Sequence, residues 1–165
     1  MAVRNVFKLG ESDDVLRKKS RPVMEIDGKT LLLIDDLKDT LHHVGGLGLA
    51  APQVGVTKKL VVIDYHGEKF VLVNPEVIEA EGSVTNEEGC LSFPGIYEKV
   101  TSPEKLTVVY QDETGAPRRL SLDGFTACVF SHEIDHLNGR LLIDRVSPLK
   151  RQFLKKKIAK RAAEK

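Results

Sequence analysis

Apolar residues recur at helical spacing in the segment before the first glycine pair of the chain. The repeat consists of Leu33, Leu37, Leu41 and Val44. Side chains three or four residues apart share one face of a helix, and glycine commonly follows the end of one. The pattern predicts a helix over residues 27–44 that leads into a glycine-rich loop at Gly45-Gly46.

Short apolar runs in the middle of the chain have the length of β-strands. They are residues 60–63, 70–73 and 106–110. The third run leads through a turn signal at 112–115 to residues 118–122, a candidate hairpin partner. Because strands come in runs between helices rather than alternating with them, we expect an α+β fold with antiparallel sheets.

A second helix is predicted between Asp123-Gly124 and Gly139, with Phe125, Val129, Phe130 and Leu137 as its apolar positions. His132 and His136 lie one turn apart on this helix, so both imidazoles can reach one metal ion. Glu133 is the residue type that takes a proton from water held by such an ion. The alternative is a surface helix that carries two histidines without function.

Two histidines leave a metal site short of a protein ligand. After His136 the chain offers only Asp144 and Glu164 as acids and no histidine, so the third ligand is expected upstream. Cys90 is the best candidate, since glycine and a Pro-Gly pair flank its segment and predict a tight, irregular connection rather than a core strand. The alternative for Cys90 is a small buried hydrophobic side chain. With two cysteines in the chain, no disulfide framework is expected.

Small residues are dense between Gly45 and Gly55, and Gln53 is the one amide side chain in that segment. A phosphate-binding loop would need a preceding strand or a Lys-Ser/Thr pair, and the sequence predicts neither here. The composition suits a backbone that runs against a ligand, with Gln53 as a neutral hydrogen-bond donor. A flexible turn after a helix is the alternative.

Three segments, residues 46–53, 88–92 and 132–136, together and in this order resemble the three motifs of the peptide deformylase family. The resemblance extends to residues 13–23 and 147–150. It implies antiparallel β-sheets packed around a central metal-binding helix, with an N-terminal helix and a C-terminal helix. The chain departs from the family pattern at Ser131, where many relatives have Gln, and at residues 93–97, which in some members carry an arginine near the substrate.

The resemblance also implies an activity, removal of the formyl group from N-terminal formylmethionine with release of formate. The metal ligands would be Cys90, His132 and His136. Glu133 would accept the proton of the attacking water and pass it to the departing amine. The backbone N–H of Leu91 and the side-chain amide of Gln53 would face the developing oxyanion.

The N-formylmethionyl peptide is expected to lie extended between the glycine-rich segment and Gly89, with its methionine in an apolar pocket. The substrate-binding residues would be Gly46, Leu47, Gly48, Glu88, Gly89, Phe125, Cys128 and Val129. Cys128 lies four residues before His132 and could close the site as a fourth ligand, but the expected role is a small packed side chain that lines the methionine pocket with Phe125 and Val129.

The metal implied by the family is Fe²⁺, one per chain, with loss of activity when the iron or Cys90 oxidises. Thiolate and imidazole ligands also accept Zn²⁺, Ni²⁺ or Co²⁺, so the residues alone leave the identity of the metal open.

Length and composition favour one domain over residues 1–165, since 165 residues with 41% hydrophobic content can bury one sizeable core. No stretch approaches the roughly 20 apolar residues of a membrane span, and the N-terminus has no signal pattern. We expect a monomer in the bacterial cytoplasm, where a free thiol ligand stays reduced.

Charge is concentrated at the C-terminus. Residues 150–165 carry eight basic residues and one acid, a balance of +7, which leaves −6 for the remainder. An apolar stripe in the same segment predicts that residues 148–165 form an amphipathic helix lying on the body, and the family resemblance implies that it docks on the ribosome near the nascent-chain exit. A solvated basic helix that binds nothing is the alternative.

Two other functions fit parts of the sequence. A zinc peptidase of the HExxH type would cleave internal peptide bonds, but the downstream ligand is missing and the chain is short for a long cleft. A non-enzymatic, zinc-bearing ribosome-binding protein would have no use for Glu133 or Gln53.

Overall fold

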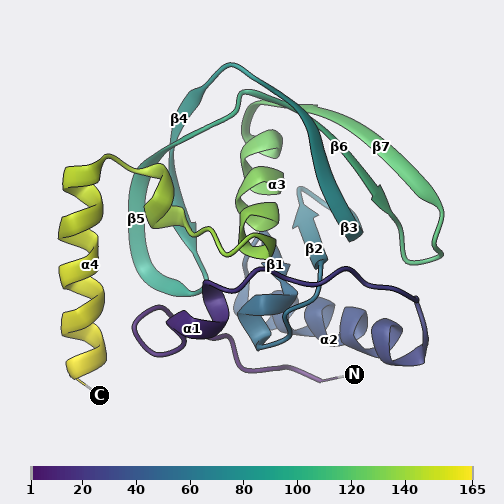
Figure 1. The fold of residues 1–165 in the computed structure, drawn as a ribbon, viewed down its shortest axis with the longest axis horizontal. Coiled ribbons are helices and arrows are strands. Elements are labelled where there is room, and N and C mark those ends of the chain that lie inside the picture. Colours follow the sequence, from purple (N-terminus) through teal and green to yellow (C-terminus); the bar gives the residue numbers. More distant parts are fainter. Residues whose placement is uncertain (1, 165) are drawn as a thin grey trace.

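Two antiparallel sheets flank one buried helix in the computed structural model, which describes residues 2–164 (Figure 1). The helices are α1 (Asp13–Leu16), α2 (Gly28–Val44), α3 (Gly124–Leu137) and α4 (Pro148–Ala163), with short 3₁₀ turns η1 (Ala51–Val54) and η2 (Leu142–Arg145). The strands are β1 (Gly48–Ala50), β2 (Leu60–Tyr65), β3 (Glu68–Glu81), β4 (Val84–Cys90), β5 (Phe93–Ser102), β6 (Lys105–Gln111) and β7 (Pro117–Asp123). The α+β prediction is confirmed.

The larger sheet has the strand order β1-β2-β3-β6-β7, and each neighbouring pair is antiparallel. The predicted hairpin is confirmed, with β6 and β7 paired in register from Lys105–Asp123 to Gln111–Pro117. The smaller sheet is the β4–β5 hairpin. Figure 1 shows α3 between this hairpin and the larger sheet, with α4 beyond β5.

The predicted helix over residues 27–44 is confirmed as α2. The Asp27 carboxylate accepts a hydrogen bond from the Thr30 backbone N–H at 3.0 Å, which caps the first turn. Leu33, Leu37 and Leu41 are buried and pack against β1 and β2, whereas Val44 is partly exposed at the end of the helix.

The sequence did not predict β4 and β5. The Cys90 segment, expected to be an irregular connection, instead ends a strand, with a register shift between Gly89 and Cys90 and a turn before Phe93. Residues 84–87 alternate between partly buried and exposed positions, and residues 84–90 contain almost no apolar side chain, so they give no apolar run. The glycine-rich segment likewise contains a strand, β1, paired with β2.

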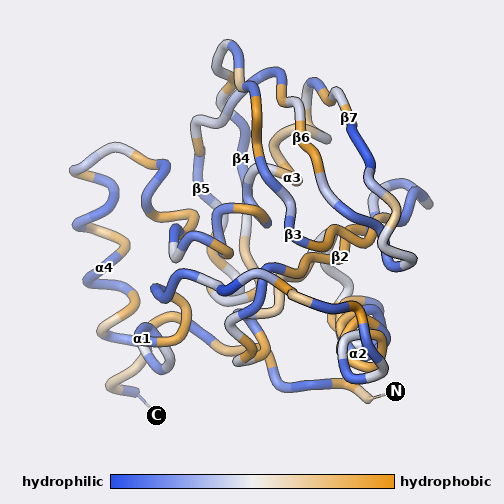
Figure 2. Tube along the Cα trace, turned by 45° about the vertical axis from the view of Figure 1, so that its right-hand side comes forward, coloured by the Kyte–Doolittle hydropathy of each residue, from blue (hydrophilic) through white to orange (hydrophobic). Residues whose placement is uncertain are grey.

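Helix α3 packs on both sides, and every residue from Ala127 to Leu137 is buried. Its apolar side chains join those of β2, β6 and β1 in one core cluster. In Figure 2 most of β2 is coloured as hydrophobic, consistent with a strand covered on both faces. No helix in the described part of the chain is long and apolar enough to cross a membrane.

Helix α4 lies on the body, as its apolar stripe predicts. Leu154 and Ile158 are buried in a third core cluster that includes Leu16 and Phe93. Leu149 and Phe153 are exposed, and Figure 2 shows polar and apolar positions interspersed along this helix. Lys165, the last residue of the basic segment, lies outside the described residues.

We expect Leu154→Ala to lower the free energy of unfolding by about 2–5 kcal/mol, because it leaves a cavity in the third core cluster. Leu149→Ala is a matched control on the same helix, since its side chain is 80% exposed, and should change stability by less than about 0.5 kcal/mol. Urea unfolding followed by circular dichroism measures both. Equal losses in the two variants would contradict the packing of α4 on the body.

Candidate metal centre

His132 and His136 occupy successive turns of α3 and face the same side of it. Their ring centroids are 5.2 Å apart with the planes at 81°. The two residues are 9% and 0% exposed because the sheet and the β4–β5 hairpin cover the helix. The predicted pair is therefore brought together in a site with little access to bulk water.

Cys90 lies at the end of β4 and presents its thiol to the two imidazoles. Its Sγ is 3.5 Å from His136 Nε2, and one donor atom from each of Cys90, His132 and His136 lies within 4.8 Å of the others. Two ligands bound at about 2.3 Å (sulfur) and about 2.05 Å (nitrogen) around a tetrahedral ion would be roughly 3.5 Å apart. The arrangement thus fits one metal ion with a free coordination position.

Burial suppresses charge on all three candidate ligands. It raises the pKa of the Cys90 thiol to about 12, with the nearby Glu133 as a second cause. It lowers the pKa of His132 to about 4 and that of His136 well below its usual value. The imidazoles are therefore neutral, as metal ligands must be, whereas the thiol needs a cation beside it to become a thiolate.

Glu133 is buried beside the candidate ligands. Its Oε1 is 3.8 Å from His132 Nε2, and its Oε2 is buried without a hydrogen-bond partner among residues 2–164. Burial, and next the charge of Asp135, raises its pKa to about 8. A β-carbon on Gly48 would lie 2.6 Å from Glu133 Cγ, so only glycine at this position lets β1 approach so closely. Such a carboxyl group can take up or release a proton near neutral pH.

Gln53 lies in η1 and is 1% exposed. Its Oε1 accepts a hydrogen bond from the Ala50 N–H at 3.0 Å, which fixes the direction of the amide. Its Nε2 then points to Ser92 Oγ at 3.2 Å and to Cys90 Sγ at 3.8 Å. The amide donor expected from the sequence therefore lies next to the candidate metal ligand.

A cavity of about 590 Å³ opens at this cluster. Of the residues expected to bind substrate or metal, those on its wall are Gly46, Leu47, Gly48, Glu88, Gly89, Cys90, Leu91, Phe125, Val129, His132 and Glu133. Gln53 and His136 lie behind the wall. Wall residues that the sequence reasoning missed include Val6, Lys8 and Val44, and nothing in their local sequence marks them as part of a site.

Cys128 does not lie on the wall of this cavity. Its side chain is fully buried on α3, and Sγ accepts a hydrogen bond from Asn86 Nδ2 at 3.4 Å. It is also outside the cluster of three donor groups. Cys128 is therefore a packed side chain behind the site. It is neither a fourth ligand nor part of the wall of the cavity.

Glu88 belongs to the wall but is 8% exposed, and its Oε2 has no hydrogen-bond partner in the described part of the chain. Burial raises the pKa of this carboxyl group to about 7, opposed by the positive charge of Arg145 and a hydrogen bond with Ser102. These interactions are thus with Arg145 and Ser102, which do not line the cavity.

Comparison with known proteins agrees with this geometry. Residues 3–152 match the family model described as polypeptide deformylase. A peptide deformylase of Halothermothrix orenii is 49% identical over 148 residues, covering 88% of this chain and 95% of that protein. One from Thermodesulfovibrio yellowstonii is 43% identical over 162 residues, covering 95% and 97%.

Solved structures are equally similar. A peptide deformylase from Legionella pneumophila superposes with a TM-score of 0.89 at 44% identity, covering 96% of this chain and 95% of that one. The enzyme from Synechococcus elongatus, solved in complex with actinonin, gives 0.86 at 41% identity, covering 93% and 85%. The chain therefore belongs to the polypeptide deformylase family.

Proposed function

We propose that this chain is a metal-dependent hydrolase that removes the N-formyl group from the N-terminal formylmethionine of nascent polypeptides and releases formate. One observation carries the proposal. In a chain of this family, the Cys90, His132 and His136 donors converge beside a cavity, and its wall includes Cys90, His132 and the buried Glu133. Neither an internal peptidase nor a non-enzymatic zinc protein is favoured by these relatives.

The metal centre would be held by Cys90, His132 and His136. When bound, the ion lowers the pKa of a water molecule and polarises the formyl carbonyl. We propose Fe²⁺ as the ion in the cell, with Zn²⁺, Ni²⁺ or Co²⁺ able to replace it.

Glu133 accepts the proton of the water that attacks the formyl carbon, and returns it to the departing amine as the C–N bond breaks. The oxygen that develops negative charge accepts hydrogen bonds from the Leu91 N–H and the Gln53 amide. The amide of Gln53 is supported in this role by the Ala50 N–H that fixes its orientation.

The peptide would lie extended along the wall, between Gly46-Leu47-Gly48 on one side and Glu88-Gly89 on the other, and add to the hairpin edge like a strand. Phe125 and Val129 would form part of the methionine pocket. The same proposal has residues 1–165 acting as a single catalytic domain, monomeric and cytoplasmic.

We further propose that the basic helix at residues 148–165 docks on the ribosome near the nascent-chain exit. What supports this is the division of α4 into two faces. Leu154 and Ile158 pack on the body, while Lys155, Lys156 and Lys160 are exposed. A cluster of free cations attracts a polyanion such as ribosomal RNA.

Anaerobic incubation of the Fe²⁺-loaded protein with formyl-Met-Ala should release formate without internal cleavage, and formyl-Asp-Ala should react much more slowly because the pocket is apolar. Glu133→Gln should keep its metal and lose about 10²–10⁴-fold in turnover, since it removes the proton acceptor and no ligand. Formate release and metal content are measured on the same samples. An active Glu133→Gln enzyme would refute the base assignment, and internal cleavage would refute the function.

Metal binding should release a proton from the Cys90 thiol. Because its pKa in the metal-free protein is raised, the thiol is protonated at neutral pH, so metal affinity should fall as the pH is lowered. Calorimetric titration with Zn²⁺ in two buffers of different ionisation enthalpy counts the protons. Cys90→Ser should release about one proton fewer and bind more weakly, and unchanged values would show that the third ligand lies elsewhere.

Replacing Lys155, Lys156 and Lys160 together by Glu should weaken co-sedimentation with 70S ribosomes and flatten its salt dependence, because exposed cations are lost. Formyl-peptide hydrolysis should stay within about twofold of wild type. The matched control reverses three exposed lysines elsewhere, Lys19, Lys29 and Lys69. Equal sedimentation of the two triple variants would leave α4 with only a structural role.

A further inference from the structure

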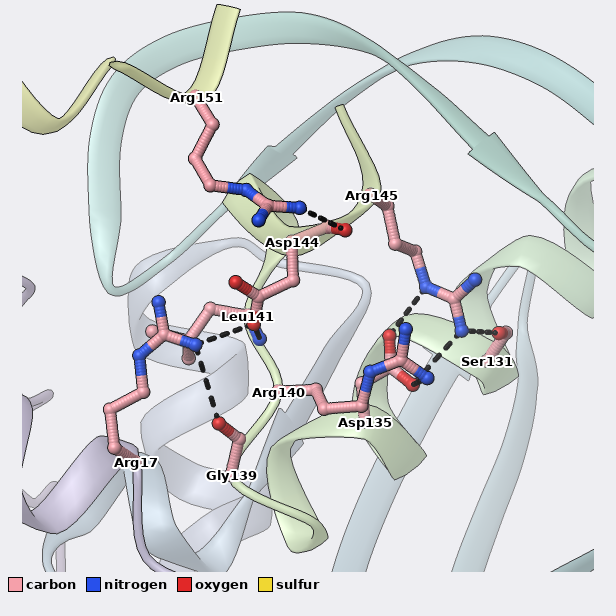
Figure 3. A network of polar contacts seen from close by, with 9 residues as sticks. All are labelled: Arg17, Ser131, Asp135, Gly139, Arg140, Leu141, Asp144, Arg145 and Arg151. Carbon is pink, nitrogen blue, oxygen red and sulfur yellow. Dashed lines mark hydrogen bonds and ion pairs between the residues drawn. The ribbon is translucent and has the colours of Figure 1, made fainter. Parts of the chain in front are cut away.

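Arg145 donates three hydrogen bonds to Ser131 and Asp135 of helix α3 (Figure 3). Its Nε donates to Asp135 Oδ2 at 2.5 Å, and its Nη2 donates to Asp135 Oδ1 at 2.9 Å and to Ser131 Oγ at 3.0 Å. The side chain is 15% exposed and that of Asp135 11%. A partly desolvated, bidentate arginine–carboxylate pair is among the stronger and more directional polar contacts in proteins.

The residues that Arg145 holds directly precede the two histidines. Ser131 comes before His132, and Asp135 comes before His136. Neighbouring helix positions point about 100° apart, so Ser131 and Asp135 share a face next to the face that carries the imidazoles. A group bonded to both Ser131 and Asp135 therefore fixes the rotation of the two helical turns that carry the candidate ligands, and their position along the helix axis.

The third ligand is linked to the same guanidinium through charge. Glu88 lies two residues before Cys90 on β4, and its buried carboxyl group is within the electrostatic reach of Arg145. Arg145 thus acts on a residue close in sequence to each of the three donors, on α3 and on the hairpin.

Arg145 is itself held by neighbouring segments. Asp144 accepts hydrogen bonds from the Leu141 N–H at 2.8 Å and from Arg17 Nη1 of the turn after α1 at 2.5 Å. Arg151 of α4 donates to the carbonyls of Ile143 and Asp144, both at 3.0 Å. Figure 3 shows Arg17, Leu141 and Arg151 around Asp144, the residue that precedes Arg145.

Gly139 completes the support. It has a φ of +71°, and a β-carbon there would lie 2.2 Å from the Arg17 carbonyl oxygen. Only glycine permits this turn between α3 and η2, so the segment that carries Arg145 has one tightly defined path.

We propose that Arg145 is a positioning residue for the metal centre. By binding Ser131 and Asp135 together, it holds His132 and His136 in the orientation in which they converge with Cys90. The inference rests on the proposed metal-dependent function. Lysine cannot replace Arg145 in this role, because an ammonium group lacks the planar guanidinium fork that spans Ser131 and Asp135.

The test uses Co²⁺-loaded full-length protein and four variants. Arg145→Lys keeps the charge, Arg145→Met removes it, and Arg145→Met combined with Asp135→Asn removes both charges of the Arg145–Asp135 pair. Arg140→Met is the matched control, because Arg140 is 53% exposed and lies 3.9 Å from Asp135, outside the fork. Each is measured for the Co²⁺ absorption spectrum, the rate of Co²⁺ loss to a chelator, urea unfolding, and kcat and KM for formyl-Met-Ala.

We expect the three Arg145 variants to lose Co²⁺ about 10–100-fold faster than wild type, with an altered visible spectrum and a lower kcat at similar KM. The double variant should regain stability to urea without regaining metal retention, and Arg140→Met should stay within about twofold throughout. If Arg145→Met fails to fold, the lysine and double variants decide the question.

The positioning role would be overturned if the lysine and double variants had the absorption spectrum of the wild type and lost Co²⁺ at the wild-type rate. Recovery of metal retention in the double variant alone would also overturn it, because Arg145 would then be only a charge partner. These outcomes are separate from failure of the proposed function, which would appear as a wild-type protein that binds no Co²⁺ or releases no formate.

Discussion

Burial of α3 is the constraint on which the rest of the structure depends. Its buried stretch contains Ser131, His132, Glu133, Asp135 and His136, so five polar groups are withdrawn from water on one short helix. Each such group costs free energy unless it is paired. Arg145 pairs with Ser131 and Asp135, whereas Glu133 Oε2 and His136 Nδ1 have no hydrogen-bond partner among the described residues. Glu133 lines the cavity, whereas His136 Nδ1 is the ring nitrogen opposite the one that faces Cys90.

The same burial explains the chemistry that the site can perform. A carboxyl group whose pKa is raised to about 8 is poised to exchange protons near neutrality, while imidazoles with lowered pKa values remain free to bind metal. Placing these groups on adjacent helix positions keeps them close without letting Glu133 become a ligand. The sheet and the hairpin thus act on the site mainly by excluding water.

The sequence predicted elements whose signals are local. Helix α2 and the β6–β7 hairpin followed from apolar spacing and turn residues, and the spacing of His132 and His136 correctly predicted a shared face. It did not predict the β4–β5 hairpin, because β4 is mostly polar and the buried apolar residues of β5, Phe93, Ile96 and Val100, do not form a continuous run. The side chain of Cys128 was expected in the pocket, but its direction depends on the tertiary contact with Asn86. The role of Arg145 depends on partners 10 and 14 residues away across a turn, which no periodicity reveals.

Basic residues of helix α4 contact the β4–β5 hairpin. Arg161 donates to the Pro94 carbonyl at 2.5 Å and lies over the Phe93 ring, and Lys150 pairs with Glu98 at 3.1 Å. Phe93 and Pro94 line the cavity just after Cys90, so the basic helix also supports the wall of the site. Deleting α4 would therefore disturb the wall of the site as well as the proposed ribosome docking. The two roles are separable only because the exposed lysines project away from Leu154 and Ile158, so that charge can change while packing is kept.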